Sequence, residues 1–135
     1  MAAVQSAPAE RWSFGEATIL RSVALTHLLL LVAGLLAPAA IFAPWGLPFE
    51  EPATFYRFAI VAIGALGFAL LRAARLPPSE GRLLVETVAL VKLAFVAVVV
   101  ADTLAHRLPN RAPVAASIDL VFGAILYRLA RRART

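Results

Sequence analysis

The chain has 135 residues, of which 61% are hydrophobic and none is cysteine, and its formal net charge is +5. A soluble domain of this length is nearer half apolar, so the composition argues against a soluble protein and predicts a single membrane domain over residues 1–135. The lack of cysteine excludes disulfides, thiolate metal sites and cysteine nucleophiles. The positive charge does not indicate a nucleic-acid partner, because the arginines lie beside apolar runs and no nucleic-acid motif accompanies them.

The chain begins with a polar stretch, 1–15, which we expect to turn helical near Ser13. The first apolar segment predicts a membrane span at 17–42, and Pro38 should bend or end that helix. A cleaved signal peptide is the alternative, because 37–39 resembles a small-residue cleavage site. The length of the segment and the acidic residues in its leader favour an uncleaved span.

A loop rich in proline and aromatic residues is predicted at 43–52, where Trp45 and Phe49 suit the headgroup zone of a bilayer. The second span follows at 53–76. Gly64 and Gly67 lie inside this span, and the absence of a side chain at both positions permits close contact with a neighbouring helix.

The third and fourth spans are predicted at 82–107 and 113–132. Ser79, in the short connection before the third span, is a candidate N-cap, and Pro113 suits the first turn of the fourth helix. Helices joined by short connections pack as antiparallel neighbours. The predicted fold class is therefore all-α, a four-helix transmembrane bundle.

The basic residues predict the orientation of this bundle. Three arginines, Arg57, Arg107 and Arg111, fall on one side of the membrane. Nine fall on the side of the chain termini: Arg11, Arg21, Arg72, Arg75, Arg82, Arg128, Arg131, Arg132 and Arg134. Because basic residues accumulate in cytoplasmic segments, both termini are predicted to be cytoplasmic, in the inner membrane of a bacterium.

Lys92 is the only lysine in the chain, and it lies in the middle of an apolar run from Leu83 to Ala101. An amine at that depth costs free energy unless a partner satisfies it, so Lys92 is the main candidate for a ligand or proton site. Folding the last two spans about their turn brings Lys92 level with Tyr127, its expected partner. Glu86 points to a different side of the helix and is expected nearer the cytoplasmic rim, beside basic residues.

Several roles for Lys92 stay open. It could be the counter-ion of an anionic substrate or lipid headgroup, a proton carrier, or an amine that forms an imine with a carbonyl compound. A structural role is also open, in which Lys92 extends along the helix surface or donates to Tyr127 and backbone carbonyls. We favour the structural role and the anion or lipid site over imine chemistry.

A second group of charges is predicted nearer the opposite face of the membrane. Arg57, Asp102 and Asp119 come from three different spans and reach about the same depth when each hairpin is folded about its turn. They could bind a proton or a cation, with His106 close by, or they could clamp the three helices together. We favour the clamp, because polar residues often hold small membrane bundles together.

No cofactor or metal site is predicted. The two histidines, His27 and His106, are too far apart in depth to ligate one haem iron from both faces. Glu86, Asp102 and Asp119 lack the spacing of di-iron bundles. No phosphate loop, serine elbow or zinc motif is present.

Four short motifs resemble a pattern in small bacterial four-helix membrane proteins of the DoxX-like group. They are Phe55–Phe58, Arg72–Arg75, Val91–Leu93 and Asp119–Phe122. The resemblance covers residues 54–132, and the opening of the first helix departs from the group's pattern. It implies a link to redox or quinone-associated membrane complexes and directs attention to Arg57, Lys92 and Asp119.

Together these features predict a small integral inner-membrane protein in contact with the lipid bilayer. We favour a non-catalytic accessory or structural subunit, with other membrane subunits or further copies of the chain as partners. The alternative is an ion-coupled carrier or lipid-handling protein that uses Arg57, Asp102 and Asp119 together with Lys92 and Tyr127. A membrane enzyme that uses these carboxylates as acid and base is a third hypothesis.

Overall fold

The computed structural model describes residues 10–45 and 54–133, and its regular elements within these ranges are all helices. In chain order they are α1 (Phe14–Leu36), α2 (Pro38–Phe42), the 3₁₀ helix η1 (Ala43–Trp45), α3 (Thr54–Ala73), α4 (Pro78–Leu104) and α5 (Ala112–Arg132). The helices α1, α3, α4 and α5 are long and apolar enough to cross a membrane, and only 28% of the most apolar stretch of each is buried. The chain is therefore a small all-α, multi-pass membrane protein whose four candidate transmembrane helices pack together.

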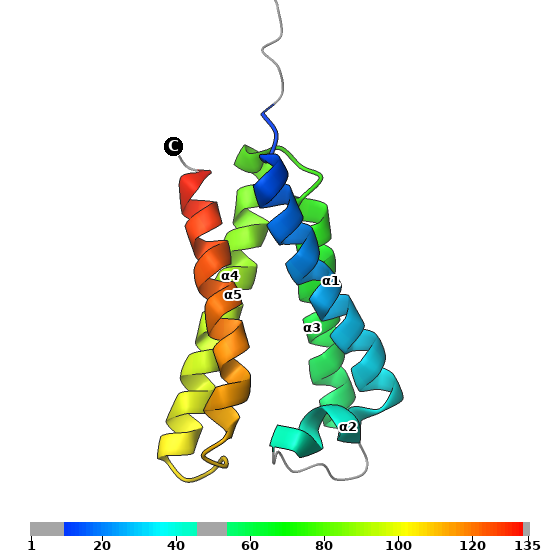
Figure 1. Ribbon diagram of the computed structural model, residues 1–135, viewed down its shortest axis with the longest axis vertical. Helices are drawn as coiled ribbons and strands as arrows, with labels where there is room; N and C mark the ends of the chain where they lie inside the picture. Colours follow the sequence, from blue (N-terminus) through cyan, green and yellow to red (C-terminus); the bar gives the residue numbers. More distant parts are fainter. Residues whose placement is uncertain (1–9, 46–53, 134–135) are drawn as a thin grey trace, which may run out of the picture.

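The four long helices form two antiparallel hairpins, α1 with α3 and α4 with α5 (Figure 1). The hairpins lie together at the end where α1 begins and α5 ends, and they diverge toward the opposite end, where α2 lies. We call these the closed end and the open end. The expected antiparallel neighbours are present, but their arrangement is a splayed pair of hairpins.

The boundaries of α1 follow from local chemistry. Ser13 caps the helix: its hydroxyl accepts the Glu16 backbone N–H at 3.3 Å, and the Glu16 carboxylate accepts the Ser13 backbone N–H at 3.0 Å. This reciprocal pair satisfies two amides at the helix start. Pro38 opens α2, so the predicted span 17–42 is divided after Leu36, as expected of proline.

The connections between the other helices differ in detail from the expected ones. Ser79 does not cap α4; the helix begins at Pro78, one residue earlier, where proline has no N–H to leave unpaired. At its other end α4 stops at Leu104, and His106 takes a left-handed backbone conformation with φ of 58°. Pro113 lies in the first turn of α5, as predicted. Most of the predicted loop 43–52, with Phe49, lies outside the described residues.

The main apolar core lies at the closed end, where all four long helices contribute to it. Its buried residues are Trp12, Leu20, Val23, Ala24, Leu70, Ala73, Val85, Val88, Ala89, Leu126, Leu129 and Ala130. A smaller cluster of Val99, Ala112 and Ala116 belongs to the α4–α5 hairpin alone. Packing between the two hairpins is therefore concentrated at the closed end.

Close backbone contacts support this core. The Trp12 indole N–H donates to the Ala73 carbonyl at 2.9 Å and so ties the segment before α1 to the end of α3. A Cβ at Gly81 would lie 2.7 Å from the same carbonyl oxygen, so only glycine allows α4 to start this near to α3. Within the first hairpin, a Cβ at Gly67 would lie 3.0 Å from the Ala24 carbonyl oxygen, which confirms the predicted close contact.

Candidate functional site

The α4–α5 hairpin contains an ion pair between the buried Lys92 and the half-buried Asp119. Lys92 lies midway along α4 and is only 6% exposed, so its side chain faces the protein and not the surrounding lipid. Gly123 allows the two helices to approach, because a Cβ there would lie only 3.0 Å from the Leu93 side chain and 3.4 Å from the Ala89 carbonyl oxygen. The charge that the sequence left without a fixed partner is therefore neutralised within its own hairpin.

An aromatic ring adds to the environment of the ammonium group. Lys92 Nζ lies 5.7 Å from the centroid of the Phe122 ring, a distance at which a cation is attracted by the ring face. Phe122 follows Asp119 by three positions on α5, so both side chains project from the same side of that helix. Lys92 thus has a carboxylate and an aromatic ring as partners on the same face.

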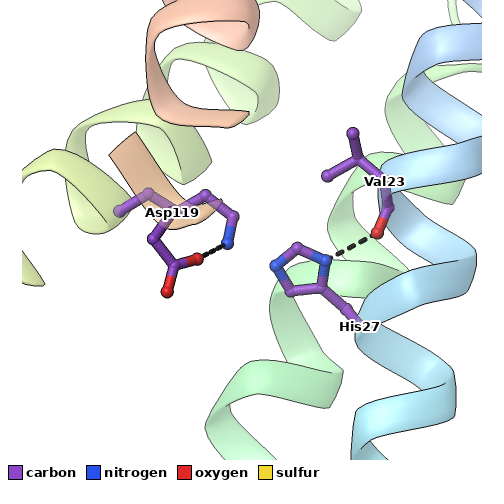
Figure 2. A network of polar contacts seen from close by, with 4 residues as sticks. Val23, His27 and Asp119 are labelled. Carbon is purple, nitrogen blue, oxygen red and sulfur yellow. Dashed lines mark hydrogen bonds and ion pairs between the residues drawn. The ribbon is translucent and has the colours of Figure 1, made fainter. Parts of the chain in front are cut away.

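His27 brings a third polar group from the other hairpin. It lies on α1 and is 2% exposed. Its Nδ1 is 2.6 Å from the Val23 carbonyl oxygen, and because a carbonyl can only accept, Nδ1 must carry a proton. Figure 2 shows the ring between Val23 and Asp119, with its other nitrogen directed away from Val23.

Two cavities adjoin these three side chains, which we call the polar centre (His27, Lys92 and Asp119). The larger, of about 330 Å³, lies between α1, α3 and α4. Its other lining residues are apolar: Leu30, Ala59, Ala62, Ile63, Leu66, Val91 and Phe95. The smaller, of about 190 Å³, is also lined by Thr26, Leu30, Ala115, Ile118 and Phe122. The polar centre thus lies where the two hairpins begin to separate.

The arrangement offers hydrogen-bonding groups of both kinds in an apolar setting. The ammonium group of Lys92 can only donate, and the ionised carboxylate of Asp119 can only accept. With Nδ1 of His27 protonated, its Nε2 accepts when the ring is neutral and donates when the ring is charged. A hydroxyl, carbonyl or acidic group that enters the larger cavity from the hydrocarbon would find partners here.

The structure pairs Lys92 with Asp119 rather than with the expected Tyr127, which is 37% exposed. Depth alone did not predict this pairing. Gly123 packs beside Leu93, so the register differs from the predicted one by about three residues. Asp119 lies farther toward the open end than the level position, and the ion pair spans that difference.

The predicted layer of Arg57, Asp102 and Asp119 is divided in the structure. Asp102 pairs with Arg107 at 3.3 Å across the end of α4, at an exposed position. The side chain of Arg57 is exposed on α3. Because the hairpins diverge at the open end, residues of equal depth on α3 and on α4–α5 do not converge (Figure 1). His106 is exposed in the turn between α4 and α5, and Glu86 lies half-buried on α4, nearer the closed end than Lys92.

His27 is the site residue that sequence reasoning missed, because it was considered there as a haem ligand and as one of the basic residues near Glu86. A signal was available, since His27 is an ionisable residue inside a long apolar run, which is the property that singled out Lys92. Its position opposite the Lys92–Asp119 pair depends on how the two hairpins pack.

No protein-family model, curated protein or solved structure matches the chain, so the resemblance to DoxX-like proteins stays a prediction. Within residues 10–45 and 54–133, no group of three or more histidine, aspartate or glutamate side chains is placed to hold a metal ion. The function must therefore be argued from the polar centre and the cavities beside it.

Proposed function

We propose that this membrane protein binds a lipid-soluble molecule with a polar, hydrogen-bonding end between its two hairpins. The observation that carries the proposal is that His27, Lys92 and Asp119 line one otherwise apolar cavity. In this role the apolar walls hold a hydrocarbon portion and the polar centre holds the head. The proposal is a form of the lipid-handling alternative that keeps Lys92 and Asp119 and adds His27. It does not use Tyr127, Arg57 or Asp102.

A purely structural role accounts for only part of this arrangement. An ion pair between α4 and α5 would suffice to hold that hairpin together, and an apolar pair of similar volume often does so equally well. A structural role for the ion pair requires neither a buried histidine on the opposite hairpin nor an adjoining cavity. The larger cavity, of about 330 Å³, also falls within the usual size range of small-molecule sites, about 300–1,000 Å³.

The test is to identify what the purified protein retains. The protein is extracted gently from its native membrane, and bound lipid-soluble molecules are measured by native mass spectrometry and by solvent extraction. We expect the wild-type protein to retain one compound, and the double variant Lys92→Met/Asp119→Leu to lose it. This variant removes both charges together, so no lone charge is left in the membrane.

Two further variants separate binding from folding. Arg57→Met removes a cationic side chain at an exposed position, and we expect it to retain the compound. His27→Phe leaves the ion pair intact and should weaken retention. Equal occupancy in all four proteins, or an empty wild-type protein, would refute the proposal, provided that each variant unfolds at a temperature near that of the wild type.

A second candidate function is that of an accessory subunit in a larger membrane complex. It is supported by the large hydrophobic side chains that all four long helices leave exposed, which could pack against an apolar helix of another protein. In that case gentle extraction should recover a stable complex with defined stoichiometry. Recovery of the chain alone, with a bound small molecule, would favour the first proposal.

We also propose that both termini face the cytoplasm of a bacterial cell, because the closed end carries most of the arginines. The absence of native cysteine allows a direct test with Glu10→Cys and Asn110→Cys, two exposed positions at opposite ends of the helices. A membrane-impermeant thiol reagent added to intact spheroplasts should label Asn110→Cys and leave Glu10→Cys unlabelled. The opposite pattern would reverse the orientation.

A further inference from the structure

A third cavity lies at the closed end, away from the polar centre. Its volume is about 430 Å³, and it is lined by Glu10, Arg11, Trp12, Ala17, Arg21, Ala74, Arg75, Leu76 and Pro77. These residues come from the segment before α1, the first turns of α1 and the connection between α3 and α4. The cavity therefore lies at the level where the apolar spans end, which is the headgroup zone of a bilayer.

The lining carries an excess of positive charge. Arg11, Arg21 and Arg75 face one acid, Glu10, and within the described part of the chain none of the three arginines forms an ion pair. Their side chains are exposed at the rim of the cavity. Guanidinium groups in this position can form paired hydrogen bonds to the oxygens of a phosphate.

The carbonyl groups at the end of α3 would oppose an anion if they faced the cavity unpaired. Two of them are hydrogen-bonded. The Ala73 carbonyl accepts from the Trp12 indole at 2.9 Å and from the Leu76 backbone N–H at 3.2 Å, and the Arg72 carbonyl accepts from Arg75 N–H at 3.0 Å. Trp12 is 8% exposed and forms a fixed inner wall. These bonds weaken, without removing, the unfavourable field of the helix end for an anion.

We propose that this cavity binds the phosphate of an anionic phospholipid, with Arg11, Arg21 and Arg75 as ligands of the headgroup. Arginines beside the ends of membrane helices attract anionic lipid, and here they surround a cavity rather than a flat surface. Leu76 and Ala17 contribute apolar side chains to the same lining. The site is separate from the polar centre and does not depend on the function proposed for it.

The experiment compares lipids bound to the purified full chain in detergent, measured by native mass spectrometry with equal amounts of phosphatidylglycerol and phosphatidylcholine. We expect the wild-type protein to retain phosphatidylglycerol preferentially. The double variant Arg21→Gln/Arg75→Gln should lose about 30-fold in this preference, which corresponds to about 1 kcal/mol for each arginine. Arg107→Gln/Arg111→Gln removes the same charge at the open end and should change the preference little.

Two arms distinguish phospholipid binding from a folding defect and from the binding of a free anion. Arg21→Lys/Arg75→Lys keeps the charge and should retain most of the preference, as a charged site requires. Inorganic phosphate in excess should not displace the lipid, because it lacks the acyl chains that anchor the headgroup. If phosphate displaces the lipid, the cavity binds a free anion instead. If both double Gln variants lose the preference for phosphatidylglycerol equally, the cavity is not a lipid site. Either result overturns the proposal.

Discussion

The closed and open ends of the protein are both built from apolar helices, but the two hairpins pack together at the closed end and diverge at the open end. At the closed end four helices share one apolar core, and tryptophan and glycine contacts bring backbones together. The buried cluster at the open end, by contrast, is formed by α4, α5 and their connection, without a contribution from α1 or α3. The polar centre lies at the boundary between these regions. The comparison indicates that the closed end provides the stability, and that the space for a ligand begins where inter-hairpin packing stops.

Among the substitutions considered, one at Lys92, where the two ends meet, should reduce the stability of the protein most. Lys92→Met leaves the carboxylate of Asp119 without its partner inside the membrane, so we expect a loss of about 3–5 kcal/mol in stability. Lys92→Met/Asp119→Leu should recover most of that loss. Both can be measured by denaturant unfolding in mixed micelles. Equal stability of Lys92→Met and the wild type would mean that the ion pair does not form in the membrane.

The closed-end core can be tested by a matched pair of leucines on α5. Leu126 is fully buried, whereas Leu120 is 48% exposed. Leu126→Ala should cost about 2–4 kcal/mol, because it leaves a cavity among all four helices, and Leu120→Ala should stay within about 0.5 kcal/mol of the wild type. The same unfolding assay measures both. Similar losses for the two variants would contradict the assignment of the core to the closed end.

Two glycines should respond to alanine in opposite directions. Gly81→Ala places a methyl group against the Ala73 carbonyl, which must force α3 and α4 apart and should cost about 1–3 kcal/mol. A Cβ at Gly15 meets nothing within 4 Å, so Gly15→Ala should stabilise α1 by up to about 1 kcal/mol. Thermal unfolding of the two variants measures the difference. A loss at Gly15 equal to that at Gly81 would show that the close approach is not the cause.

The smallest expected effect concerns the contact that ties the chain to the end of α3. Trp12→Phe keeps an aromatic ring in the core but removes the N–H that donates to Ala73, so we expect a loss of about 1 kcal/mol. Ser13→Ala, at the next position, removes the cap of α1 and should cost a similar amount. Hydrogen exchange should then rise at the start of α1 for Ser13→Ala, and at Leu76 and its neighbours for Trp12→Phe. A uniform rise along the chain would argue against these local roles.

The sequence was sufficient to predict the four helices, because each depends on a long apolar run and on local breakers. Pro38 ends the first helix and Pro113 lies in the first turn of the last one, as predicted, since proline acts through its own ring and its missing N–H. The predicted third span, 82–107, differs from α4, Pro78–Leu104, by only a few residues at each end. Depth alone nevertheless did not identify the partner of Lys92, because the level position predicted Tyr127 and the actual partner, Asp119, lies eight positions earlier on α5.

The sequence by itself determined that charges lie inside the membrane-spanning segments, because Lys92, His27 and Asp119 each occur within an apolar run. Only the tertiary structure decided which of them meet. The hairpins diverge toward the open end (Figure 1), and Arg57 and Asp102 belong to different hairpins. His27 faces Asp119 from the other hairpin (Figure 2). Neighbouring apolar side chains specify neither the angle between the hairpins nor the register, since Val, Leu and Ala pack in many arrangements of similar free energy. Close contacts at particular glycines select one of them.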